Sequence, residues 1–220
     1  EGGANATVVV WHGFTNAPSQ FGQVGDQLRA AGYRVLVPRM PHHGQADVLT
    51  RDLATLTDAE LVEHANDCVD IAAGFGDPVW VIGLSAGATL AAWVAATRTE
   101  VRRLVLAAPL VAPKGFPMPL VRAFVRYPAI VPGFYYWWDP RKKADLGHSP
   151  YAYPGFPVPG LMPNLRLSEA LFDHSVAAGH RLERVVLASN PGDFAIRRDA
   201  ARDFASGVFA PHADVFGEAS

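Results

Sequence analysis

The sequence predicts one doubly wound α/β domain with a mostly parallel sheet, and three observations support this prediction. Five short segments rich in β-branched and apolar residues have the pattern of buried strands, and helical patterns separate most of them. Strands that are apolar on both faces are typical of a parallel sheet covered by helices on both sides. The 220 residues, 50% of them hydrophobic and 18% charged, suffice for one substantial core.

The first two predicted strands enclose one helix. Residues 7–11 read TVVVW, a β-branched run typical of a buried strand. Apolar residues then recur at helical spacing over 21–31, and Gly32 can end that helix. A second strand is expected at 33–37, closed by Pro38.

A second helix is predicted to begin with a capping box. Thr57 precedes Glu60 by three residues, a pairing that satisfies two otherwise unpaired amides at a helix start. The apolar face of this helix is formed by Leu61, Val62, Ala65, Cys68, Val69 and Ala72. The remaining elements are expected as strands at 79–84, 103–107 and 184–188 and an alanine-rich helix at 86–97.

A segment rich in proline and aromatic residues interrupts this alternation. It spans residues 109–165 and contains Phe116, Pro117, Pro119, Tyr135, Tyr136, Trp137, Trp138, Tyr151, Tyr153 and Phe156. We interpret it as a cap inserted over the carboxyl ends of the strands, with residues 1–108 and 166–220 forming the core domain. A long surface loop is the alternative, but exposing so many large apolar side chains to water would be unfavourable.

The composition argues against several classes of function. A net charge of −2 provides no basic footprint for nucleic acid, and no apolar run is long enough to span a bilayer. The single cysteine, Cys68, allows no intrachain disulfide, so the fold must be stabilised by packing. A cytoplasmic location is favoured, although the cysteine count also fits an exported protein. The oligomeric state is left open.

A serine flanked by glycines is the first candidate for chemistry. The run Gly83–Gly87 reads GLSAG, matches G-x-S-x-G, and lies where a predicted strand passes into a predicted helix. A tight turn there lifts the hydroxyl of Ser85 clear of the sheet, and larger flanking residues would collide with the neighbouring strand and helix. We therefore interpret Ser85 as a nucleophile. A turn that only packs the helix on the sheet is the alternative.

The nucleophile needs a base to remove its proton and a carboxylate to orient that base. On a strand-to-helix turn of this kind, the acid and then the histidine follow the serine along the chain. Asp193 comes shortly after the strand at 184–188, and His212 is the histidine that follows every plausible acid. We expect Asp193 to be the acid and His212 the base. A turn aspartate and an ordinary surface histidine are the alternatives.

Two backbone amides are candidates for an oxyanion hole. The amide of Ala86 follows the nucleophile at a helix N-terminus, where the helix dipole favours an anion. The amide of Phe14 lies just after the first strand, and Gly13 permits the close backbone approach that this position requires. His12 is expected to brace this loop rather than to move protons.

Residues that contact the substrate are expected in the same loop, in a second loop and in the cap: His12, Gly13, His43 and Trp138. The neighbouring His42 and His43 raise the question of a metal site. Adjacent histidines point apart, however, and no group of carboxylates or cysteines completes a ligand shell. No metal and no cofactor are therefore predicted.

Taken together, these motifs resemble the α/β-hydrolase superfamily, and most closely its carboxylesterases and monoacylglycerol-lipase-like members. Residues 11–16 (WHGFTN) are similar to the HGF oxyanion loop of that family, and residues 41–44 (PHHG) to its PGHG loop. GLSAG and Asp193 with the apolar residues after it complete the match. The resemblance implies a triad of Ser85, Asp193 and His212, with the amides of Phe14 and Ala86 binding the oxyanion.

The function predicted from the sequence is hydrolysis of a small carboxylic ester through an acyl-enzyme on Ser85. The aromatic cap favours an apolar acyl or alcohol group. The same triad would also serve on amide, peptide or thioester bonds, or in acyl transfer. A different class, a non-catalytic ligand-binding protein of the same fold, has no need of an intact triad.

Overall fold

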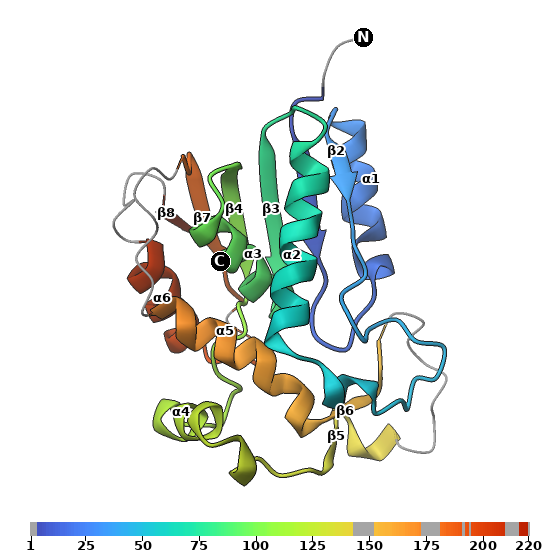
Figure 1. Cartoon of the computed structure of the whole chain (residues 1–220), viewed down its shortest axis with the longest axis vertical. Helices are drawn as coiled ribbons and strands as arrows, with labels where there is room; N and C mark the ends of the chain where they lie inside the picture. Colours follow the sequence, from blue (N-terminus) through green and yellow to red (C-terminus); the bar gives the residue numbers. More distant parts are fainter. Residues whose placement is uncertain are drawn as a thin grey trace.

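The structure is a twisted sheet with helices on both faces and irregular segments gathered at one end (Figure 1). This computed structural model describes residues 4–142, 152–172, 181–190, 192–193, 195–209 and 216–219. The strands of the main sheet are β1 (Thr7–Trp11), β2 (Arg34–Leu36), β3 (Val79–Leu84), β4 (Val101–Ala107), β7 (Arg184–Ala188) and β8 (Phe216–Ala219). Their order is β2-β1-β3-β4-β7-β8.

All neighbouring pairs in this sheet are parallel, which confirms the predicted fold class. The predicted bounds of β1, β3 and β7 agree with the structure, whereas β2 is shorter than expected and β4 begins two residues earlier. All five residues of β1 are buried, as its uniformly apolar sequence requires. The edge strand β8 was not predicted, because its sequence FGEA has no β-branched run to signal a strand.

The helices cover both faces of the sheet. They are α1 (Gly22–Ala30), α2 (Asp58–Ala73), α3 (Ala86–Thr97), α4 (Met118–Arg126), α5 (Met162–Phe172) and α6 (Arg198–Phe209). In Figure 1, α2 and α3 lie in front of the sheet and α1 lies behind it. Ten of the twelve residues of α3 are buried, because the sheet, α2 and α5 surround it. No helix in the described part of the chain has both the length and the apolar sequence needed to cross a bilayer.

Helix α2 begins at the predicted capping box. The Thr57 side chain accepts a hydrogen bond from the Glu60 amide, and the Glu60 carboxylate accepts one from the Thr57 amide at 2.9 Å. Five of the six residues predicted for its apolar face are buried, and Val62 is partly buried against the same core. Just after α1, Gly32 has a φ of 85°, a left-handed conformation that favours glycine. Both helix boundaries thus follow from local sequence.

The segment between β4 and α5 has its own local structure. It contains α4, the short antiparallel pair β5 (Tyr135–Trp137) and β6 (Gly155–Pro157), and the 3₁₀ turns Pro128–Ile130, Pro140–Lys142 and Val158–Leu161. All lie toward the carboxyl ends of the sheet strands, at the bottom of Figure 1. Position 165, the expected end of the cap, falls within α5. The pair β5–β6 was not predicted, since three-residue strands carry too few residues to display an alternating pattern.

Candidate active site

Ser85 lies on a strained turn between β3 and α3. Its backbone has φ 55° and ψ −115°, a region that residues with a side chain seldom occupy. The turn is held on three sides. The Ser85 amide donates to the Ala107 carbonyl at 2.8 Å, and the Ser85 carbonyl accepts from the amides of Ala88 and Leu110 at 3.0 and 3.1 Å. The surrounding backbone therefore fixes a conformation that is unfavourable in isolation.

The two glycines of the motif allow this turn to pack closely. A Cβ atom at Gly83 would lie 2.1 Å from the carbonyl oxygen of Gly87. A Cβ atom at Gly87 would lie 2.4 and 2.5 Å from the carbonyl oxygens of Trp11 and His12. These neighbours are backbone atoms of α3, of β1 and of the residue that follows β1, which cannot move aside without disturbing the sheet. A side chain at either glycine would therefore collide with neighbouring backbone, as expected from the sequence.

The loop after β1 approaches Ser85 directly. A Cβ atom built on Gly13 would be 3.7 Å from the Cβ of Ser85, so the backbone of this loop lies beside the serine. The loop closes through a hydrogen bond from the Asn16 amide to the Gly13 carbonyl at 3.1 Å. Among the described residues, the Phe14 amide has no hydrogen-bond partner. Ala86 begins α3, where helix amides point outward without an intrahelical acceptor.

Thr15 is a feature of this loop that the sequence did not reveal. It is buried and has φ 66°, which is strained for a β-branched residue. Two residues of the segment between β4 and α5 hold it. Trp138 donates from Nε1 to the Thr15 hydroxyl at 3.0 Å, and the Tyr153 amide donates to the Thr15 carbonyl at 2.7 Å. The segment between β4 and α5 is thus hydrogen-bonded to the loop that carries the Phe14 amide.

His12 is buried and fully engaged with backbone. Its Nδ1 lies 2.9 Å from the Gly13 carbonyl oxygen, and its Nε2 accepts a hydrogen bond from the Met40 amide at 3.2 Å. This pattern requires the proton on Nδ1. Burial lowers the pKa of His12 from 6.5 to about 4. A neutral ring with both nitrogens occupied braces the loop, as expected.

His43 is also buried, but one of its nitrogens is unoccupied. Its Nδ1 lies 2.7 Å from the Pro41 carbonyl oxygen, and its Nε2 has no partner among the described residues. Burial lowers the pKa of His43 from 6.5 to about 3, and the nearby His12 acts in the same direction. The ring stacks edge-on against Phe14, with the centroids 5.5 Å apart. Its neighbour His42 turns toward Asp52 and Glu60 instead.

Because these two histidines are buried, we expect the protein to lose stability in mild acid. Their folded-state pKa values of about 4 and 3 lie below the ordinary 6.5, so the unfolded chain binds more protons below pH 6.5. As the pH falls from 6.5, each should remove up to about 1.4 kcal/mol of unfolding free energy per pH unit until its folded pKa is reached. Urea unfolding at several pH values measures this.

A matched variant isolates one of the two contributions. His43→Asn keeps a side-chain N–H for the Pro41 carbonyl but removes the titrating imidazole. As the pH is lowered, the unfolding free energy of this variant should therefore decrease less steeply than that of the wild type. A wild-type unfolding free energy that stays constant between about pH 6.5 and 4 would contradict the burial of two neutral rings.

Asp193 lies on a loop that follows β7. Its Oδ1 accepts hydrogen bonds from the amides of Ala195 and Ile196 at 2.8 and 3.0 Å, which is the turn chemistry considered as the alternative for this residue. The loop after β4 pairs with it. The Lys114 amide donates to the Ala195 carbonyl, and the Lys114 ammonium to the Asp193 carbonyl, both at 2.8 Å. Ala195 and Ile196 line the same cavity as Ser85.

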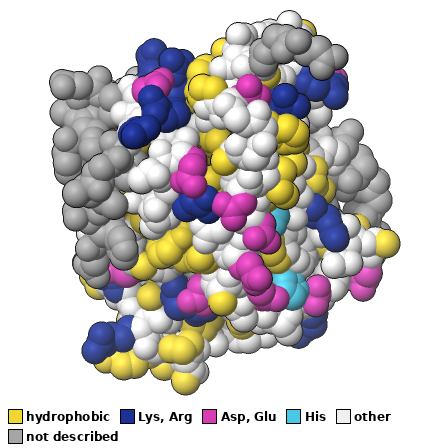
Figure 2. All heavy atoms as spheres, turned by 45° about the horizontal axis from the view of Figure 1, so that its top comes forward, with side chains coloured by type: hydrophobic (Ala, Val, Ile, Leu, Met, Phe, Trp, Pro, Cys, Tyr) yellow, Lys and Arg dark blue, Asp and Glu magenta, His cyan; other side chains and the backbone are white. Residues whose placement is uncertain are grey.

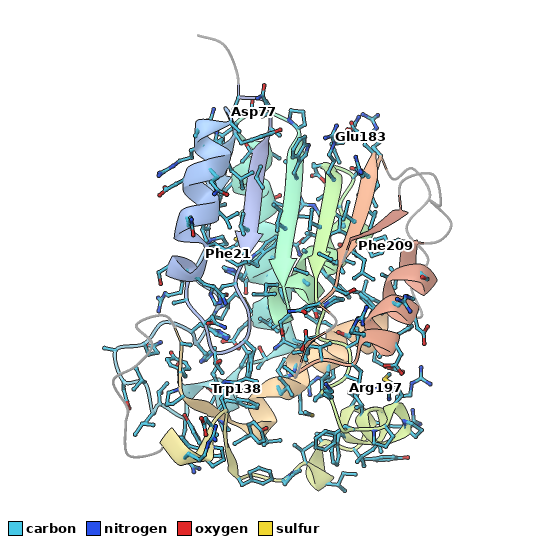
Figure 3. All side chains as sticks on the ribbon, turned by 180° about the vertical axis from the view of Figure 1, so that it is seen from behind. Phe21, Asp77, Trp138, Glu183, Arg197 and Phe209 are labelled. Carbon is cyan, nitrogen blue, oxygen red and sulfur yellow. The ribbon has the colours of Figure 1, made fainter. Side chains whose placement is uncertain are left out.

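Ser85 opens into an apolar cavity of about 370 Å³. Its walls come from α4, the β5–β6 pair, α5 and the loops after β4 and β7, including Val121, Phe134, Phe156, Leu165 and Ile196. Figure 3 shows Trp138 and Arg197 at this end of the sheet, with Asp77 and Glu183 at the opposite end. Most of the lining side chains are hydrophobic, so the site favours an apolar group within reach of the Ser85 hydroxyl.

The structure brings some of the predicted site residues together. Ser85 and Trp138 line the cavity, and Gly13 lies beside the serine. His12, Gly13 and His43 are not among the residues of the cavity wall. His212 lies outside the described residues. The sequence did not identify the wall residues of α4 and α5, although Val121 and Phe124, like Met162 and Leu165, recur at helical spacing.

Comparisons with known proteins place this fold. A search of curated proteins finds no significant match. Among solved structures, a monoglyceride lipase from Saccharomyces cerevisiae has a TM-score of 0.72 at 14% identity, covering 99% of this chain and 77% of the lipase. A Paleococcus ferrophilus monoacylglycerol lipase has a TM-score of 0.68 at 15% identity, covering 99% and 84%. A metagenome-derived lipolytic enzyme has a TM-score of 0.66 at 20% identity, covering 99% and 82%.

At these identities the structural likeness establishes the fold and leaves the activity open. The sequence itself matches the model of the alpha/beta hydrolase family over residues 8–217, which is nearly the whole chain. The match includes β1, the GLSAG turn and β7. The protein therefore belongs to the alpha/beta hydrolase family.

Proposed function

We propose that this protein is a serine hydrolase that cleaves carboxylic esters through an acyl-enzyme on Ser85. The observation that carries the proposal is the position of Ser85, on a strained turn in the wall of an apolar cavity. Its hydroxyl has no hydrogen-bond partner among the described residues, so within that part of the chain it is available to a substrate. Lipolytic enzymes among the similar structures are consistent with this activity.

The reaction proceeds in two steps. Oγ of Ser85 attacks the ester carbonyl carbon while a histidine takes the hydroxyl proton. The resulting oxyanion accepts hydrogen bonds from the amides of Phe14 and Ala86, and the intermediate collapses as the histidine returns the proton to the departing alcohol. Water then attacks the acyl-enzyme by the same route, which releases the acid and restores Ser85. Asp193 orients the histidine and stabilises its charged form.

His212 is the base that the sequence favours, and the position of β8 bears on how far that residue is from Ser85. Phe216, four residues later, pairs with Val185 near the start of β7, whereas Ser85 follows the carboxyl end of β3. Phe216 lies three strands away from β3 and four residues short of Ser85 along the strand direction. Together these offsets amount to a distance of roughly 20 Å. Four residues span at most about 14 Å. The assignment of His212 as the base therefore stays a prediction, which the His212→Ala variant tests.

The segment 109–165 acts, in this proposal, as a cap that shapes the substrate site. It supplies much of the cavity wall, and its Trp138 and Tyr153 hold the strained Thr15 of the oxyanion loop. Apolar acyl groups then bind in the cavity while the carbonyl meets Ser85.

The proposal is tested with p-nitrophenyl esters of increasing acyl length, together with matched amide and thioester substrates. We expect ester hydrolysis with an initial burst of p-nitrophenol on esters whose acyl-enzyme breaks down more slowly than it forms. If the protein cleaved the amide or the thioester faster than the ester, that bond would be assigned as its substrate instead. A folded protein that hydrolyses none of the substrates would instead favour a ligand-binding role.

The cavity predicts a dependence on acyl length that one substitution should change. Leu165 of α5 is buried in the cavity wall, and Leu165→Phe adds volume where the acyl chain would lie. We expect kcat/KM for the octanoate ester to fall about tenfold while that for the acetate ester changes little. Leu49→Phe, at an exposed leucine away from the cavity, is the control. Equal losses on both esters would place the acyl chain elsewhere.

A further inference from the structure

The surface around the cavity mouth is unusually apolar. Eleven large hydrophobic side chains of the described residues are exposed, and seven of them lie between Phe116 and Trp138. Tyr127 and Ile130 are the most exposed of these, at 56% and 55%. A concentration of this kind on one side of a molecule marks an interaction surface. We call the surface formed by residues 116–138 the cap face.

The cap face also lies in the most basic part of the chain. Residues 109–142 contain Lys114, Arg122, Arg126, Arg141 and Lys142 but a single carboxylate, Asp139, in a chain whose net charge is −2. By contrast, α2 carries five carboxylates and no lysine or arginine. Figure 2 shows acidic side chains down the middle of the face that it presents, with Lys and Arg side chains among them. The chain is therefore electrically asymmetric.

The cations of the cap segment are accessible to a partner. Arg126 is exposed at the end of α4 and lies 5.9 Å from the ring centre of Tyr127. Arg122 pairs with Glu169, and its side chain is still 56% exposed. The side chain of Arg141 pairs with Asp139 and is 90% exposed. Basic side chains and exposed apolar side chains thus come from the same segment, which lies at the bottom of Figure 1.

We propose that the cap face docks on a lipid surface that carries anionic headgroups. Apolar side chains such as Ile130 and Phe134 would enter the headgroup boundary, and Arg126 and its neighbours would lie against lipid phosphates. Phe134, Tyr136 and Trp138 are exposed and also line the cavity. Docking therefore turns the cavity mouth toward the lipid, so an apolar ester passes to Ser85 without crossing water.

A second copy of the chain fits this surface less well. In a two-fold dimer the same surface meets itself, which would bring the cations of both cap segments together. Residues 109–142 have five cations against one carboxylate, so such an interface would be repulsive. An anionic partner removes that repulsion, and a lipid surface also accommodates the apolar side chains between the cations.

Flotation of the full chain with vesicles tests the proposal without reference to catalysis, so it can fail or succeed independently of the esterase activity. The vesicles are phosphatidylcholine with or without phosphatidylglycerol. We expect binding to the anionic vesicles to exceed binding to the neutral ones and to weaken with salt. Arg126→Glu changes the charge by two units and should weaken binding roughly 30-fold, at about fivefold per charge.

A pair of matched variants tests the apolar contact. Ile130→Ser should weaken binding by about tenfold. Ile71→Ser, at an isoleucine of α2 that is 54% exposed, should leave binding unchanged. Equal binding to both vesicle types, or equal loss in both isoleucine variants, would overturn the proposal. A dimer in vesicle-free solution that Ile130→Ser dissociates, or binding to an oligonucleotide but not to vesicles, would assign the cap face to those partners instead.

Discussion

Ser85→Ala is expected to abolish ester hydrolysis and to leave the protein folded. The acyl-enzyme cannot form without Oγ, and loss of the nucleophile in serine hydrolases costs on the order of 10⁴-fold to 10⁶-fold in rate. Stability should change little, because the Ser85 hydroxyl has no partner among the described residues and alanine meets the same backbone strain. Turnover of p-nitrophenyl esters and urea unfolding of the same preparation measure the two effects.

Ser19→Ala is the matched control, since Ser19 is exposed in the short turn before α1. Its activity should equal that of the unmodified protein. Retained activity in Ser85→Ala would remove Ser85 from the mechanism. Loss of folding in that variant would mean that the hydroxyl has a structural role.

Gly83→Ala is expected to have the largest effect on stability. The added methyl would lie 2.1 Å from the Gly87 carbonyl oxygen, 2.3 Å from its carbonyl carbon and 2.4 Å from the Ala88 nitrogen, all of them backbone atoms. Relief requires α3 to move away from β3, so we expect a loss of about 3 kcal/mol or more in the free energy of unfolding. Urea unfolding followed by tryptophan fluorescence measures this loss.

Gly22→Ala provides the control for that variant. Gly22 begins α1 in a helical conformation, and no atom lies within 4 Å of the position where its Cβ would stand. Alanine there should be neutral or stabilising, by up to about 1 kcal/mol, because it restricts the unfolded chain. If Gly83→Ala had the same free energy of unfolding as Gly22→Ala, the close packing of β3 on α3 described above would be contradicted.

Local signals were sufficient for most of the core. The apolar runs of β1 and β3 predicted their own bounds, and the Thr57–Glu60 box predicted the start of α2, because each depends on residues close in sequence. Edge strand β8 and the β5–β6 pair depend instead on distant partners. Gly155 illustrates this: a Cβ atom there would lie 2.2 Å from the Tyr136 carbonyl oxygen, a contact that nothing in the local sequence announces.

The candidate site divides in the same way. Ser85 and its flanking glycines form a contiguous motif, so the sequence predicted both the turn and the reason for the glycines. The strained Thr15 and its hydrogen bond from Trp138 join residues more than a hundred positions apart, and no periodicity or motif encodes such a contact. The cavity walls likewise come from segments distant in sequence. The role of His212 stays a prediction.

The most direct test of an activated Ser85 is reaction with a fluorophosphonate probe, followed by mass spectrometry of the labelled peptide. The account predicts a covalent adduct on Ser85, and the same experiment on His212→Ala shows whether that histidine supplies the base. Loss of labelling there would support the triad, and unchanged labelling would assign the base to another group. A folded protein that leaves Ser85 unmodified, or that reacts at a different serine, would contradict the central claim.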